Sequence, residues 1–240
     1  MAKQLNVPSL QHLARCWQED PLKIQKTLVQ LYKSTPTFNY KPMYGAVTDL
    51  LVFDQPYEEV KKGIRDKVGR EWLRDNYLEI LSLIRKHFNG VSTDFVHSVD
   101  VRMYGVGKTL MVPFTPPLIY GSGGAIVFPW FSFWKSQPLA GKNLSLFVSL
   151  VDEVLLQDPD LEDARFEILD FSSPRPKEPR KLAVVDAEDI PRLDMGEVTE
   201  MLETFAIAFA AAQRQIEEAQ RANDAEPQRP HDDRQRGLFD

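Results

Sequence analysis

A long internal segment without a charged residue, 109–134, most constrains how this chain can fold. A segment of that length and character could cross a lipid bilayer as one helix. It is interrupted, however, by four prolines and three glycines, which would leave backbone groups unsatisfied in lipid. The strand-forming runs 118–120 and 125–128 flank the glycine-rich sequence 121–124. The segment therefore predicts a buried β-hairpin at the centre of a core.

Helical patterns lie on both sides of this segment. Apolar residues at three- and four-residue spacings predict helices near 10–17, 21–32, 57–68, 70–88 and 143–157. The spacing of Asp194 and Glu197 is that of a capping box, and it begins a long C-terminal helix expected to reach about Arg221. The stretch 34–56 has a mixed pattern and receives no assignment.

Strand patterns occupy the middle of the chain. Residues 95–104 alternate with a period of two, which predicts a strand with His97 and the other odd-numbered residues on its buried face. Further strands are predicted near 110–113, 164–171 and 182–185. The basic, proline-rich segment 173–181 is expected to be an extended connector.

These elements predict an α+β fold with a central, mainly antiparallel sheet flanked by helices, including N-terminal helices and a long C-terminal helix. We expect one globular domain over 1–222, made of an N-terminal helical part, 1–90, and a sheet-containing core, 91–222. The remaining residues, 223–240, are mostly polar and include prolines. Such a composition buries too little apolar surface to offset chain entropy, so we expect a disordered tail.

Charge and cysteine content narrow the functional classes. The formal net charge of -6 gives no overall reason for attraction to a nucleic acid or an anionic membrane. One cysteine, Cys16, allows neither an internal disulfide nor a thiolate zinc cluster, and the N-terminus lacks the apolar run of a signal peptide. We therefore expect a cytoplasmic protein. No spacing of the four histidines indicates a metal site, and no cofactor motif is present.

The order helix, three strands, helix, strand between Arg70 and Phe171 resembles the core of the PD-(D/E)XK nuclease-like superfamily, an α-β-β-β-α-β arrangement. Metal-dependent members need an aspartate on one strand and an acid-x-lysine on the next. Here Phe133 stands where the acid two residues before Lys135 belongs. The resemblance thus favours a non-catalytic member. The alternative is a divergent metal-dependent nuclease that uses some of three carboxylates, Glu153, Glu167 and Asp170.

The last residues of the chain carry a second resemblance. The sequence 235–239, Gln-Arg-Gly-Leu-Phe, is similar to the peptide by which bacterial polymerases and repair proteins bind the sliding clamp. In that family the glutamine is hydrogen-bonded at one subsite and the Leu-Phe pair fills an apolar pocket. The resemblance implies these roles for Gln235, Leu238 and Phe239. The chain departs from the usual pattern at Arg236, where an apolar residue is common, and at Asp240.

Together these patterns predict a non-catalytic interaction or accessory protein, in bacterial DNA metabolism, with a protein partner bound through the tail. A third reading is a sensor of a small molecule or peptide whose pocket lies under the aromatic hairpin. Trp130 and Trp134 of that hairpin are the candidate surface aromatics. The sequence leaves direct nucleic-acid binding and oligomeric state open.

Overall fold

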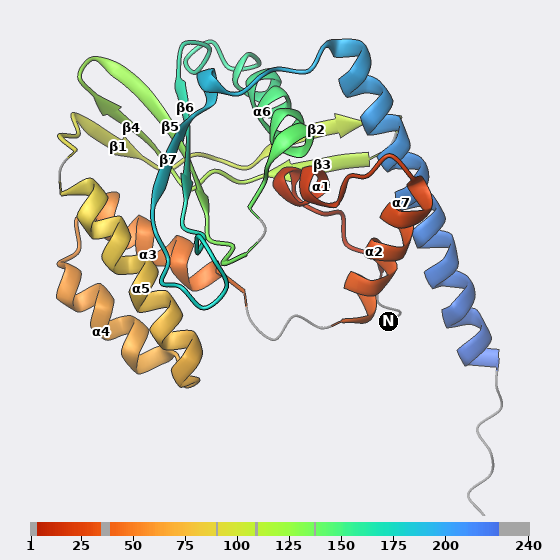
Figure 1. Cartoon of the computed structure of the whole chain (residues 1–240), viewed down its shortest axis with the longest axis horizontal. Coiled ribbons are helices and arrows are strands. Elements are labelled where there is room, and N and C mark those ends of the chain that lie inside the picture. The colour runs from red at the N-terminus through yellow and green to blue at the C-terminus, as the bar shows by residue number, and fades with distance from the viewer. Residues whose placement is uncertain (1–3, 35–38, 90, 109, 137, 226–240) are drawn as a thin grey trace, which may run out of the picture.

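The structure is a computed structural model that describes residues 4–34, 39–89, 91–108, 110–136 and 138–225 (Figure 1). Within these ranges the chain forms seven α-helices, one short 3-10 helix and seven strands. In chain order they are α1 (Leu10–Cys16), α2 (Pro21–Lys33), α3 (Lys41–Leu51), α4 (Tyr57–Lys67), α5 (Glu71–Phe88), β1 (Phe95–His97), β2 (Arg102–Val106), β3 (Leu110–Phe114), β4 (Ile119–Ser122), β5 (Ala125–Ser132), α6 (Gly141–Leu155), β6 (Arg165–Asp170), β7 (Ala183–Asp186), η1 (Ala187–Asp189) and α7 (Met195–Ala225).

A five-stranded sheet in the order β1-β4-β5-β6-β7 forms the centre of the molecule. Strands β5 and β6 are parallel and are connected through α6, whereas the other neighbours in the sheet are antiparallel. Strands β2 and β3 form a separate antiparallel pair. The predicted α+β fold with a mainly antiparallel sheet and a long C-terminal helix is therefore confirmed.

The hairpin of β4 and β5 forms where the charge-free segment predicted it. Ser122 is paired with Ala125, and the two intervening residues, Gly123 and Gly124, have φ angles of 59° and 81°. Only glycine adopts two successive left-handed conformations without strain, so this tight reversal depends on the glycine pair. The side chains of the segment are core residues, including Val112, Phe114, Leu118, Tyr120, Phe128, Trp130 and Phe131.

Each face of the sheet carries its own hydrophobic core (Figure 1). Helices α3, α4 and α5 pack on one face, and α1, α2, α6, α7 and the β2–β3 pair pack on the other. Helix α6 is buried around most of its circumference, as its uniformly apolar sequence predicts. A hydrogen bond of 3.0 Å from Trp17 Nε1 to the Met201 carbonyl ties the segment after α1 to α7. Among the described helices, none has the length and apolarity needed to cross a membrane.

The single strand predicted over 95–104 is wrong. The segment is divided between β1, which pairs with β4, and β2, which pairs with β3. The buried face of β2 consists of Tyr104 and Val106, whereas Val101 and Met103 are 53% and 46% exposed. His97 is exposed as well and stacks on Phe95 at 5.3 Å. The alternation was correct in period, but burial follows the face that meets α6 and α7 and not the face with more apolar residues.

Helix α3 lies in the stretch that received no assignment. Its N-cap residue, Tyr40, makes no side-chain cap, but Asn39 just before it accepts a hydrogen bond of 2.9 Å at Oδ1 from the Lys41 backbone N–H. Helix α7 begins as predicted, with Asp194 Oδ1 accepting from the Glu197 N–H at 2.8 Å. The Glu197 carboxylate forms a salt bridge with Lys142 Nζ at 2.7 Å, which joins the start of α7 to the start of α6.

Gly121 generates a prediction about the edge of the sheet. It is the register partner of Phe95, and a Cβ atom at this position would lie 2.4 Å from Phe95 Cε1. Gly121→Ala must displace the ring, so urea denaturation should show a loss of about 1 to 3 kcal/mol in the free energy of unfolding. Phe95→Ala in the same chain should remove most of this penalty.

Gly63→Ala is the matched control, because a Cβ atom there would have nothing within 4 Å in the interior of α4. Helix propensity predicts a gain of up to about 1 kcal/mol. Equal stability changes for the two substitutions would contradict the close approach of Phe95 to Gly121.

Candidate ligand-binding pocket

A cavity of about 810 Å³ opens at the end of β5. Its walls come from α1, from α3 and the residues just before it, from the loops that follow β1 and β3, and from the residues 130–134 at the end of the charge-free segment. Sites for small ligands typically enclose about 300 to 1,000 Å³. The cavity is therefore large enough for a ligand, and it lies where segments distant in sequence meet.

Aromatic rings form much of this wall. Phe133 lies 5.0 Å from Tyr44 and 5.6 Å from Tyr40, measured between ring centroids. Trp130 and Trp134 meet edge to face at 5.5 Å. Rings in these geometries are held by contacts with one another, and their remaining surfaces line the cavity. The pocket thus offers rigid apolar contact area.

Trp130 is not a surface aromatic, contrary to the expectation from the sequence. It is only 3% exposed, because its ring packs on Phe147 of α6 at 4.6 Å. Trp134 is half-buried and lies between two side chains of α1, with the His12 ring at 5.5 Å and the Arg15 guanidinium carbon at 4.2 Å from its ring. Both tryptophans line the pocket instead of an outer face.

The tyrosine side chains connect the pocket to the sheet. Tyr44 Oη donates a hydrogen bond of 3.2 Å to the Phe131 carbonyl, which joins α3 to β5. Burial raises the pKa of the Tyr44 hydroxyl well above its usual range, so it remains a neutral donor. Helix α3 is consequently held in one position against the strand end.

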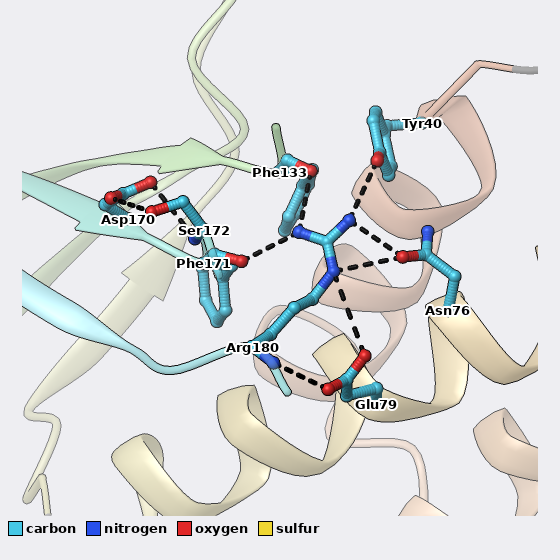
Figure 2. A network of polar contacts seen from close by, with 8 residues as sticks. All are labelled: Tyr40, Asn76, Glu79, Phe133, Asp170, Phe171, Ser172 and Arg180. Carbon is cyan, nitrogen blue, oxygen red and sulfur yellow. Dashed lines mark hydrogen bonds and ion pairs between the residues drawn. The ribbon is translucent and has the colours of Figure 1, made fainter. Parts of the chain in front are cut away.

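A buried arginine, Arg180, braces the same region from behind (Figure 2). Its side chain has no exposed surface, and its Nη1 donates to the Phe133 and Phe171 carbonyls at 3.0 and 2.7 Å. Its Nε and Nη2 donate to Asn76 Oδ1 at 3.0 and 2.8 Å, and Nη2 also donates to Tyr40 Oη at 3.0 Å.

Glu79 completes this network. Its Oε1 accepts from the Arg180 backbone N–H at 2.7 Å, and its Oε2 lies 4.0 Å from Arg180 Nε. The guanidinium therefore joins α5, the ends of β5 and β6, and the residue that precedes α3 (Figure 2). Because every one of its nitrogens is satisfied, the cost of burying the charge is offset by hydrogen bonds. The pocket wall formed by Tyr40 and Phe133 is held by this network.

Two polar side chains of α1 face the aromatic rings. Gln11 Oε1 is buried and has no hydrogen-bond partner among the described residues, although Gln11 lines the pocket. The His12 Nδ1 atom lies 2.7 Å from Ser9 Oγ. Much of the His12 side chain is exposed, but its contacts with the pocket wall desolvate the ring in part, and this desolvation, with a smaller effect of the Arg15 charge, lowers the pKa of the imidazole. The described lining residues include Lys41 but no aspartate or glutamate.

The three carboxylates of the nuclease alternative are not brought together. Glu153 on α6 accepts a hydrogen bond of 2.5 Å from Tyr104 Oη. On β6, Glu167 bonds to Tyr120 Oη at 3.1 Å and to Arg165, whereas Asp170 accepts from the Ser172 N–H and Oγ at 3.2 and 2.8 Å.

Residues 167 and 170 are three apart on a strand, so their side chains lie on opposite faces of the sheet. Glu167 accordingly shares a face with Leu169 and the helices α3 to α5, while Asp170 faces the other core beside Ile168. In the part of the chain that the structure describes, no group of three or more His, Cys, Asp or Glu side chains could hold a metal ion. Gln235, Leu238 and Phe239 lie outside the described residues.

Comparisons with known proteins do not identify a family for this chain. No family model matches the chain, and no curated protein matches it. Among solved structures, the crystal structure of SSO0001 aligns with 76% of this chain and 83% of its own length, at a TM-score of 0.32 and 13% sequence identity. A similarity at that level indicates nothing about the function of the pocket.

The Arg180 network generates a stability prediction. Arg180→Met would leave two buried carbonyls and the Asn76 side chain without their donor, and removing one partner of such a buried network costs about 3 to 5 kcal/mol. The loss for Arg180→Lys should be intermediate, since one ammonium cannot reach all four acceptor atoms. Urea denaturation measures both changes.

Arg175→Met is the matched control, because that arginine belongs to the same connector and its side chain is 81% exposed. Its effect should stay within about 0.5 kcal/mol. A similar loss for Arg175→Met and Arg180→Met would contradict the bracing role of Arg180.

Proposed function

We propose that this protein is a non-catalytic binding protein whose aromatic pocket receives a small ligand. The observation that carries the proposal is a cavity of about 810 Å³ whose walls are aromatic rings already held in place. Rigid rings lose little conformational freedom when a ligand binds, so the affinity gained from their contact area is reduced only slightly by a loss of side-chain entropy. Of the three functions that the sequence suggested, the cavity supports a sensor of a small molecule or peptide most directly.

We also propose that the fold contains a PD-(D/E)XK-like core. Helix α5, strands β1, β4 and β5, helix α6 and strand β6 follow the order of that superfamily, with the β2–β3 pair inserted after the first strand. The matching strands for the metal ligands are β4 and β5, and neither contains an aspartate or glutamate. Phe133, at the position of the missing acid, is part of the pocket wall. The superfamily core would therefore serve here as a scaffold for binding.

The separation of Glu153, Glu167 and Asp170 supports a non-catalytic protein over a divergent nuclease. A metal ion in a hydrolytic site needs carboxylates that converge on one point. Two of these three already have charged or hydroxyl partners on different elements, and the third is bound by its own turn. While β6 keeps the regular alternation of a strand, Glu167 and Asp170 stay on opposite sides of the sheet, even if the whole strand were turned over.

Gly45 offers a direct test of the pocket. It lines the cavity, and a Cβ atom there would have nothing within 4 Å, so a leucine can project into the open space without a clash. With the neutral dye N-phenyl-1-naphthylamine as probe, we expect saturable fluorescence enhancement by the unaltered chain. Gly45→Leu should lower the affinity at least about tenfold, as loss of 1.4 kcal/mol of contact would do.

Gly63→Leu is the matched control, since Gly63 is also a helical glycine with open space around it. Gly45 and Gly63 both line a groove between α3 and α4, but of the two only Gly45 also lines the aromatic pocket. Near-UV circular dichroism checks that both variants are folded. Equal dye binding by Gly45→Leu and the unaltered chain would overturn the proposed pocket.

We further propose that the tail binds a bacterial sliding clamp, which would make the protein an accessory of DNA metabolism in the cytoplasm. The specific support is the sequence 235–239, with Gln235, Leu238 and Phe239 at the positions of the clamp-binding anchors. Nine residues, 226–234, separate it from Ala225, where α7 ends. Apolar anchors at the end of a polar segment can dock into a pocket that orders them on binding.

Truncation after Arg234 tests this second function by calorimetry with a purified sliding clamp. The full chain should bind, and the truncated chain should give no measurable heat. Leu238→Ala should weaken binding at least about tenfold, whereas Arg236→Leu should strengthen it because an apolar residue is usual there. Equal binding by the truncated and full chains would rule out the tail as the docking peptide.

A further inference from the structure

We infer that the ligand of this pocket is a planar heteroaromatic anion that carries an N–H donor. This inference rests on the proposed ligand-binding function and specifies the chemical class that the walls select. Three independent properties of the described lining residues support it: the sign of the charge around the cavity, the shape of its surfaces, and one hydrogen-bonding group that has no partner.

The charge around the cavity is positive. Lys41 lines the pocket, and neither it nor Arg15 has a salt bridge within the described residues. The Arg15 guanidinium lies 4.2 Å from the Trp134 ring and donates to the Ser136 carbonyl at 3.3 Å, so it is held beside the wall. Behind the wall, the charge of Arg180 is paired with Glu79, so the positive charge at the cavity comes from Lys41 and Arg15. With no acid among the described lining residues, a negative ligand group is favoured.

The surfaces of the cavity favour a flat ring. Tyr40, Tyr44 and Phe133 come together on one side of the network of rings, and Trp130 and Trp134 form a second pair. Aromatic ligands gain from stacked or edge-to-face contacts with such rings beyond the area they bury. A saturated ring of the same size would bury similar area but would lack those contacts. The walls therefore discriminate by planarity as well as by size.

Gln11 supplies the hydrogen-bonding requirement. Its Oε1 is a buried acceptor without a partner among the described residues, and such an atom is destabilising until a donor reaches it. Partial desolvation lowers the pKa of His12, beside it, which disfavours a further positive charge there. Oε1 is buried in this position, so the Gln11 side chain has to turn toward the cavity that it lines before a ligand N–H can satisfy the acceptor. An indole or similar ring with an acidic substituent combines all three properties.

A matched series of ligands tests the inference by calorimetry. Indole-3-acetate, indole-3-acetamide and tryptamine share one ring and its N–H, and differ in charge. We expect the acetate to bind at least tenfold more tightly than the amide, and tryptamine to bind most weakly of the three. 1-Methylindole-3-acetate, which lacks the N–H, and cyclohexylacetate, which lacks the flat ring, should each bind at least fivefold more weakly than indole-3-acetate.

Substitutions connect these preferences to the residues. Lys41→Gln should reduce the preference for acetate over amide at least threefold, whereas Lys62→Gln, a change at an exposed position on α4, should leave it unchanged. Gln11→Leu should reduce the difference between indole-3-acetate and its 1-methyl derivative. A difference that persists in Gln11→Leu would overturn the role of Gln11.

The outcomes separate this inference from the function on which it rests. Equal binding of acetate and amide, tighter binding of tryptamine, or equal binding of cyclohexylacetate would overturn the ligand class. If the neutral dye binds and Gly45→Leu blocks it while no member of the indole series binds, the pocket stands and the ligand class is wrong. If neither the dye nor the series binds, the proposed function itself fails.

Discussion

Strand β5 is buried on both faces and lies in the middle of the sheet, paired with β4 over its first residues and with β6 from Val127 to Ser132, and the rest of the structure follows from that position. Val127 and Phe131 enter the core under α3 to α5, while Phe128 and Trp130 enter the core under α6 and α7. With β4 on one side and β6 on the other, β5 has no place for a charged side chain. The same burial that stabilises the sheet thus removes the acids that a metal-dependent nuclease needs at this strand.

The pocket forms where β5 leaves the core. Pairing with β4 ends at Val127 and pairing with β6 ends at Ser132. Beyond that point Phe133 and Trp134 meet residues from α1 and α3. Such an edge would be loose without a brace. The Arg180 guanidinium provides one, because its side chain is fully buried and donates hydrogen bonds to four protein acceptors. Stability and binding are linked here, because the same carbonyl and hydroxyl groups hold the network and position the rings.

The proposed functions divide the molecule into a rigid part and an appended peptide. The rigid part is a sheet whose three candidate carboxylates take part in separate contacts, with an aromatic cavity that Lys41 also lines. The peptide follows the end of α7 and carries its own recognition residues, Gln235, Leu238 and Phe239. A binding protein of this kind could report the presence of a ligand to a partner bound through the tail, without performing chemistry on either.

The sequence by itself determined the helices α2, α4, α5, α6 and α7, the hairpin at Gly123 and Gly124, and the burial of the charge-free segment, because periodicity, turn chemistry and the cost of burying charge are local properties. Only the tertiary structure decided which face of β2 is buried and that Arg180, which the sequence placed in a plain connector, becomes the fully buried brace. It also brought Gln11 to the rings of Tyr40 and Trp134. Tyr40 and Arg180 are 140 residues apart, and a contact at that separation depends on how whole elements pack, which no local pattern records.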